Sequence, residues 1–103
     1  MRCLGRLRVA AAALPGAREA LTFGNPAFRV GGKAFAVIDH YQGSDCLWLR
    51  VEPALRAELL ARRGWFPSPY DPKKAAACCA VEAFDWRRLA PLLRASYRLA
   101  RGR

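Results

Sequence analysis

The 103-residue sequence is poor in the residues from which most catalytic and metal sites are built. It contains a single histidine, His40, and only eight acidic residues. One histidine and four cysteines without a Cys-x-x-Cys pair provide no zinc ligand set of the usual spacing. His40 follows Asp39 in a predicted strand, where successive side chains diverge, so the two are not an acid–base pair. No Ser/His/Asp or Cys/His arrangement is readable, and we expect no enzymatic activity, no metal and no cofactor.

Long apolar segments are also absent. The run VAAAAL at residues 9–14 is too short and too rich in alanine to span a membrane. Arg8 interrupts the apolar part that a signal peptide needs, and no small-x-small cleavage motif follows. We therefore expect a helix at residues 2–13, no membrane partner, and a cytoplasmic protein whose thiols stay reduced.

What the sequence does contain is apolar surface and positive charge. The apolar fraction is 53%, which is enough for a core, and the length suits a single domain over residues 1–103. Eighteen basic residues against eight acidic ones give a net charge of +10. Such a charge attracts DNA or another polyanion. Fifteen of the basic residues are arginines, so arginine usage typical of a GC-rich genome is an equally open explanation.

The spacing of apolar and turn residues predicts an α+β fold. Strands grouped between helices favour two layers, an antiparallel sheet with the helices packed on one face. The order is helix, three or four strands, helix, one or two strands, helix. The predicted elements are a helix at 2–13, strands at 19–23, 27–30, 33–41 and 46–51, a helix opening at Glu52-Pro53, a loop at 65–74, a strand at 75–84 and a helix capped by Asp85.

Several local features make the prediction specific. Gly31-Gly32 favours a tight hairpin turn, and GNP at 24–26 favours another turn. Gly64 is the expected cap of the second helix, with Arg62 and Arg63 in its last turn. Pro91 is awkward inside the last helix, so we expect a kink there or a helix that starts near Ala90. Cys78 and Cys79 are neighbours in a strand, so one should be buried and the other exposed.

An ordered series of short motifs resembles the MmcQ/YjbR family of small bacterial proteins. The motifs are Leu14-Pro15-Gly16, Glu19, Phe23-Gly24, Pro26, Phe28-Arg29-Val30, Lys33, Phe35, YDPKK at 70–74, Asp85-Trp86 and Ser96-Tyr97. The resemblance implies a fold similar to the frataxin-like and secretion-chaperone-like architectures, and no catalytic residues. It also implies DNA binding by a double wing of two hairpins. Ala76 stands where the family usually has a tryptophan, which puts the second wing in doubt.

The candidate binding residues are cations on the two predicted wings, in the last turn of the second helix and on the last helix. They are Arg29, Lys33, Arg62, Arg63, Lys73, Lys74, Arg94 and Arg98. The alternatives remain open. Lys33 could guard a sheet edge, the arginines of the last helix could be its solvated face, and Ser96-Tyr97 could bond the helix to the sheet.

Two other functions are compatible with the sequence. The first is a protein-interaction or dimerisation module that uses the open face of the sheet, as a monomer or weak homodimer. The second is a pocket for a small anion under the proline-rich loop, lined by Trp65, Tyr70 and Arg29.

Overall fold

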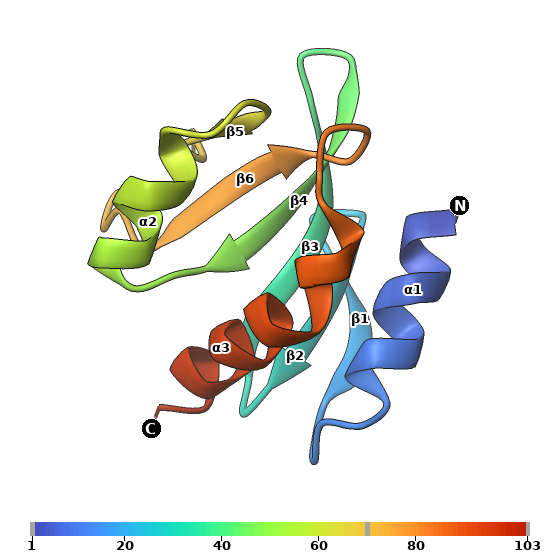
Figure 1. Cartoon of the computed structure of the whole chain (residues 1–103). Coiled ribbons are helices and arrows are strands. Elements are labelled where there is room, and N and C mark those ends of the chain that lie inside the picture. Colours follow the sequence, from blue (N-terminus) through green and yellow to red (C-terminus); the bar gives the residue numbers. More distant parts are fainter. Residues whose placement is uncertain (1, 70, 103) are drawn as a thin grey trace.

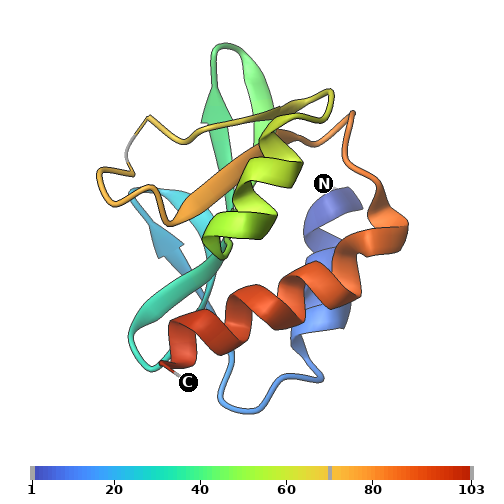
Figure 2. The same cartoon turned by 60° about the vertical axis from the view of Figure 1, so that its left-hand side comes forward.

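A six-stranded antiparallel sheet forms the centre of the molecule, with strand order β1-β2-β3-β4-β6-β5. The computed structural model describes residues 2–69 and 71–102. Three α-helices lie on one face of the sheet (Figures 1 and 2), as the sequence predicts for an α+β fold. The elements are α1 (Arg2–Ala11), β1 (Arg18–Thr22), β2 (Asn25–Val30), β3 (Lys33–Tyr41), β4 (Ser44–Arg50), α2 (Pro53–Leu60), β5 (Trp65–Phe66), β6 (Ala76–Ala80), a 3-10 turn η1 (Trp86–Arg88) and α3 (Leu89–Arg101).

The core fills the space between the sheet and the helices. α1 contributes Leu7 and α3 contributes Leu93, both almost fully buried. The ring of Tyr97 meets Phe35 of β3 edge-on at 5.5 Å, and the Tyr97 hydroxyl donates to the carbonyl of Pro15. These contacts hold α1 and α3 on the sheet. The buried residues agree with the apolar spacing that predicted the two helices.

The β2–β3 hairpin forms where Gly31-Gly32 predicts it. Both glycines have positive φ, 57° and 82°, as a type I′ turn requires, and Val30 pairs with Lys33 across the turn. The pairing then shifts by one residue, because Arg29 pairs with Ala34 while Phe28 pairs with Ala36. Phe35 is therefore the extra residue of a β-bulge.

The predicted turn at 24–26 is wrong by one residue. Asn25 and Pro26 belong to β2, and the turn consists of Phe23 and Gly24, both with positive φ. Gly24 is the residue that suits this backbone, whereas Phe23 adopts it at φ 51° with its side chain fully exposed. The prediction placed Pro26 in the turn, but a proline near the start of a strand is tolerated.

Three other boundaries differ from the prediction. α2 ends at Leu60 and is capped at Ala61, so Arg62 and Arg63 lie beyond it, and Gly64 at φ 90° instead turns the chain into β5. The predicted loop at 65–74 contains this short strand at its start, and the strand predicted at 75–84 covers only Ala76–Ala80.

The last helix begins close to the predicted point. The Asp85 carboxylate accepts from the backbone N–H of Arg87 and caps η1, and α3 follows from Leu89. Pro91 lies in the first turn of α3, where a missing N–H costs no helix bond. In the described part of the chain, no helix is long and apolar enough to cross a membrane.

Candidate functional site

The two ends of the sheet differ in charge. One end is where β1, β3 and β6 begin and where β2, β4 and α3 finish; we call it the basic end. Besides Arg8 and Arg56, which bind Glu19 and the carbonyl of Ala76, eight basic residues lie near it with three acidic ones, Glu19, Glu52 and Asp71. The eight are Arg18, Arg29, Lys33, Arg50, Lys73, Lys74, Arg98 and Arg101.

Two of the three acidic residues at the basic end are already engaged. Glu19 binds Arg8 at 2.8 Å, and this ion pair lowers the pKa of Glu19. The Asp71 carboxylate accepts from the backbone N–H groups of Ala75 and Ala76 at 2.9 and 2.8 Å. The cations at this end therefore have little carboxylate to neutralise them.

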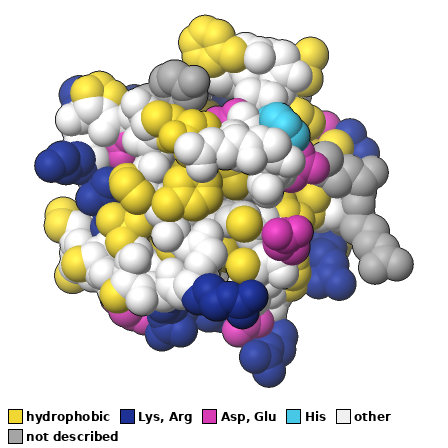
Figure 3. All heavy atoms as spheres, turned by 90° about the horizontal axis from the view of Figure 1, so that it is seen from above, with side chains coloured by type: hydrophobic (Ala, Val, Ile, Leu, Met, Phe, Trp, Pro, Cys, Tyr) yellow, Lys and Arg dark blue, Asp and Glu magenta, His cyan; other side chains and the backbone are white. Residues whose placement is uncertain are grey.

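The opposite end carries balanced charge. Five acidic residues lie there with five arginines, and two of the arginines, Arg62 and Arg87, bind Glu58 and Asp85 at 2.9 and 3.0 Å. Figure 3 looks onto this end, where acidic groups and His40 lie among neutral and apolar side chains and several Lys and Arg side chains are also visible. The acidic residues are Asp39, Asp45, Glu58, Glu82 and Asp85, and the arginines are Arg6, Arg62, Arg63, Arg87 and Arg88.

The structure brings the two predicted hairpins to the same end. Lys33 is exposed at the β2–β3 turn, and Lys73 and Lys74 are exposed in the loop of the β5–β6 hairpin. Only the end of β4 lies between them, because Arg50 pairs with Ala76 of β6 and donates from Nε to the carbonyl of Ala34 in β3 at 2.7 Å. The cations of both hairpins thus lie near one another.

The remaining candidates are distributed differently. Arg98 is exposed in the last turn of α3, which ends close to the β2–β3 turn (Figure 2), and Arg94 is exposed one turn further back. Arg62 and Arg63 lie at the opposite end, where they line a recess of about 130 Å³ with Arg88. The sequence prediction placed all of them on one interface, but the direction of α2 carries this pair away from the lysines.

Arg29 forms two hydrogen bonds within the fold. As predicted, it faces away from the helices, opposite to the buried Phe28 and Val30. Its Nη1 donates to the carbonyl of Gly32 at 2.8 Å, and its Nη2 donates to Oγ1 of Thr22 at 3.0 Å. These bonds tie the β1–β2 and β2–β3 hairpins together.

The open face of the sheet contains a cavity that the sequence did not reveal. Its volume is about 670 Å³. Its walls include Ala34, Val37 and Trp48, and at its other side Asn25 and Asp39. Arg50 borders this cavity, because its guanidinium lies over the Trp48 ring at 5.5 Å. Desolvation, together with the nearby charge of Arg29, lowers the pKa of Arg50, and Asp71 opposes this shift.

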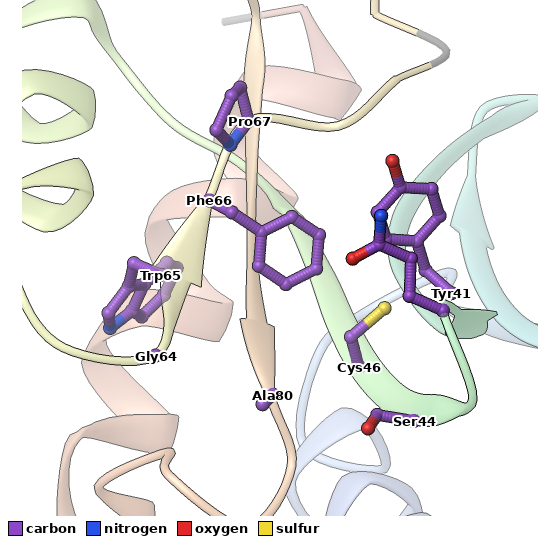
Figure 4. A pocket seen from close by; sticks show the side chains of 9 residues that line it. Tyr41, Ser44, Cys46, Gly64, Trp65, Phe66, Pro67 and Ala80 are labelled. Carbon is purple, nitrogen blue, oxygen red and sulfur yellow. The ribbon is translucent and has the colours of Figure 1, made fainter.

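A second cavity of about 460 Å³ lies beside β5 and is lined by Trp65, one of the three residues predicted for a pocket under the proline-rich loop. Figure 4 shows that the side chains of Tyr41, Cys46 and Phe66 gather around it, and the two rings stack at 5.6 Å. Arg29 is not among its lining residues, and Tyr70 lies outside the described residues, so the predicted trio is not brought together.

The prediction that one of the two adjacent cysteines is exposed is wrong. Cys78 and Cys79 are 2% and 0% exposed, because Phe66 pairs beside Cys78 and the loop after it places the buried Ser68 over the open face. Burial raises the pKa of Cys79 to about 11. The Cys78 thiol donates to Cys46, which lowers the pKa of Cys46 and raises that of Cys78. In the described part of the chain, no three His, Cys, Asp or Glu side chains are grouped to hold a metal.

The model of the YjbR family matches residues 12–99. The chain belongs to the YjbR family. Among solved structures, it is similar to Deinococcus radiodurans protein DR2400, which contains a DUF419 domain; the identity is 26%, the TM-score 0.82, and the match covers 97% of this chain and 79% of that one. A protein from Pseudomonas syringae has the same fold at 17% identity and TM-score 0.74, over 94% of this chain and 97% of that one. No curated protein matches the chain.

Membership of the YjbR family establishes a small domain of unclear function with no known catalytic activity. The family resemblance also predicts a tryptophan at the position of Ala76. Ala76 is fully buried at the start of β6; its N–H donates to Asp71 and its carbonyl accepts from Nε of Arg56 at 2.9 Å. In this YjbR protein the start of β6 is thus held by backbone contacts of Ala76, with no aromatic side chain at that position.

Proposed function

We propose that this chain is a non-enzymatic nucleic-acid-binding domain whose contact surface is the basic end of the sheet. The observation that carries the proposal is the charge segregation, eight basic residues besides Arg8 and Arg56 against three acidic ones at one end and balanced charge at the other. If genome composition alone explained the arginines, they would be scattered over the surface, and the two ends would not differ in charge. A cation cluster of this kind binds the phosphate backbone, which any duplex or single strand presents.

The exposed members of the cluster are suited to phosphate contact. Lys33, Lys73 and Lys74 are exposed on two adjacent hairpins, and none forms an ion pair with a described residue. Arg98, at the end of α3, extends the same surface. Lysines on turns are mobile point charges that follow the backbone without reading base sequence. We therefore propose binding with weak sequence preference.

The surface supports the alternative, a protein-interaction module, less well. The exposed large apolar side chains of the described residues are Val9, Leu21, Phe23 and Leu99, which lie on α1, on β1 and its turn, and on α3. They do not form one patch of several hundred Å², the size typical of interaction sites. The open face of the sheet is also partly covered, since Cys78 and Ser68 are buried there.

The test compares two double variants with the same change in charge. Fluorescence anisotropy with a labelled duplex and a labelled single strand is measured at several salt concentrations for the wild type, Lys73→Glu/Lys74→Glu and Arg62→Glu/Arg63→Glu. The lysine variant should bind more weakly, and its slope of log K against log salt should be less steep by about 1.8, since each phosphate contact contributes about 0.9.

The arginine variant at the opposite end is the matched control and should bind nearly as the wild type does. Circular dichroism confirms that both variants are folded. Absence of binding at low salt would refute the proposal for this chain. Equal losses in the two variants would show that net charge, and not the basic end, determines binding.

A further inference from the structure

The cavity on the open face has the features of a small-molecule site, and the exposed lysines of the proposed nucleic-acid surface do not line it. Its volume of about 670 Å³ lies within the range of about 300–1,000 Å³ typical of ligand pockets. Val37 and Trp48 give it an apolar and aromatic wall, and Phe23 stands at its rim. Ligand pockets generally combine such a wall with a few polar groups that orient the ligand.

Two arginines contact residues that line the cavity, although neither lines it directly. Arg50 is fixed by the bond from its Nε to the carbonyl of Ala34, and its Nη1 and Nη2 donate to no described residue. Arg29 is held close by through Thr22, which also lines the cavity. Neither arginine has a carboxylate partner within 4.0 Å among the described residues. Asp71 offsets the repulsion that Arg29 exerts on Arg50, and an anionic ligand would stabilise the partly buried charge of Arg50 further.

The other side of the cavity accepts hydrogen bonds. Oδ1 of Asp39 accepts from Nδ2 of Asn25 at 3.1 Å and from the backbone N–H of His40 at 2.8 Å, which fixes the carboxylate. Oδ2 of Asp39 accepts from no described residue. A buried or half-buried carboxylate oxygen of this kind favours a ligand N–H group.

Phe23 is an exposed aromatic residue among those that line the cavity. Its side chain is fully exposed and its φ is 51°, a conformation that costs a non-glycine residue on the order of 1 kcal/mol. The backbone conformation is that of the two-residue β1–β2 turn, and the ring is exposed there. A ring at the rim of the cavity could close over a planar ligand.

We propose that the cavity binds a nucleotide, with the base beside Trp48 and Phe23, an amino group of the base donating to Asp39 and the phosphate on Arg50 and Arg29. The nucleotide could be free or part of a single strand, since both present the same base and phosphate. Stacking of a base on an aromatic ring contributes about 1–3 kcal/mol.

The experiment follows the indole N–H signal of Trp48 in ¹⁵N-labelled protein, assigned with Trp48→Phe. The probes are adenosine monophosphate, adenosine, inorganic phosphate and a short single-stranded oligo(dA). Adenosine monophosphate should shift the Trp48 signal in a saturable way, and adenosine and phosphate should each bind at least tenfold more weakly. Tighter binding of the oligonucleotide would identify the strand as the source, and equal or weaker binding would identify the free nucleotide.

Two variants test the contacts. Arg50→Gln should weaken binding of adenosine monophosphate about tenfold, as expected for loss of one charged hydrogen bond, and leave adenosine unchanged. Phe23→Ala, which removes a fully exposed side chain and so leaves the fold intact, should weaken both. Arg62→Gln and Lys73→Glu/Lys74→Glu are the controls and should leave binding of the mononucleotide unchanged.

No shift of the Trp48 signal at millimolar nucleotide, or shifts that appear at Trp65 or Trp86 instead, would overturn the proposal. Unchanged affinity in both Arg50→Gln and Phe23→Ala would do the same. Because the lysine variant removes only the proposed phosphate surface at the hairpins, failure of that surface and failure of this cavity are distinguishable.

Discussion

Replacing Ser96 by alanine should destabilise the protein more than a single lost hydroxyl suggests. Ser96 lies in α3, is fully buried, and bridges two strands. Its Oγ donates to the carbonyl of Phe35 at 2.5 Å and accepts from the backbone N–H of Arg50 at 2.9 Å. Phe35 is the bulge residue, and the β3–β4 pairing stops at Ala36 and Leu49. The hydroxyl therefore replaces a missing ladder bond.

The expected cost follows from the two backbone groups that Ser96→Ala would leave without a partner. Each buried group without a partner costs about 1–3 kcal/mol. Burial of the site leaves no room for water to replace the hydroxyl, so we expect a loss of about 2–4 kcal/mol. A domain of this size has a free energy of unfolding of about 5–15 kcal/mol. The loss corresponds to a fall in Tm of roughly 10–20 °C.

The assay is urea unfolding followed by tryptophan fluorescence and far-UV circular dichroism. Ser96→Ala should lower the midpoint without changing the m value, because the folded structure is retained. Ser44→Ala is the matched control: Ser44 is exposed at the β3–β4 turn, and its replacement should change stability by less than about 0.5 kcal/mol. A loss below about 0.5 kcal/mol for Ser96→Ala would refute the bridging role of the hydroxyl.

Two further predictions concern the backbone and the thiols. Gly64→Ala places a Cβ 2.4 Å from the Cβ of Ala83 at φ 90° and should cost about 2–4 kcal/mol; Gly32→Ala, at φ 82° in open space, should cost only about 1–2 kcal/mol, and equal losses in thermal unfolding would contradict the clash. The pKa of Cys79 is raised from 9.0 to about 11 by burial, so the folded protein holds this proton more tightly than the unfolded chain. The stabilisation is complete below pH 9 and is lost as the pH rises through about 11; urea midpoints under reducing conditions should fall over that range, and less so in Cys79→Ala.

Local chemistry in the sequence was sufficient for most of the fold. Gly31-Gly32 allows the positive φ values of a tight turn. Asp85 is a residue type that caps the start of a helix, and it does so here. The Ser96-Tyr97 pair was predicted to bond helix to sheet. Ser96 does so, whereas the Tyr97 hydroxyl donates to Pro15 in the loop between α1 and β1. Boundaries were less accurate where tertiary contacts decide them. β5 has two residues and exists because it pairs with β6, so no propensity in its own sequence could mark it.

The burial of both cysteines could not be predicted from the sequence for a different reason. Alternation in a strand tells that Cys78 and Cys79 point to opposite faces, and that is true of the structure. It does not tell that the loop after β5 folds over the open face and buries Cys78 as well. Likewise, the cavity is lined by Thr22, Asp39 and Trp48, which come from three different strands. The register of the whole sheet determines that these residues lie close together.

The position of the second hairpin depends on one feature of the topology that the sequence does not display. If the last strands followed chain order, β5 would pair with β4 and run antiparallel to it, and the β5–β6 turn with Lys73 and Lys74 would lie at the end opposite to Lys33. Instead β6 inserts between β4 and β5, so β6 runs in the same direction as β3 and both begin at the basic end. The pairing of Arg50 with Ala76 makes this possible, since it brings the start of β6 against the finish of β4. The order of two strands thus determines whether the lysines of this chain form one cluster or two separate ones.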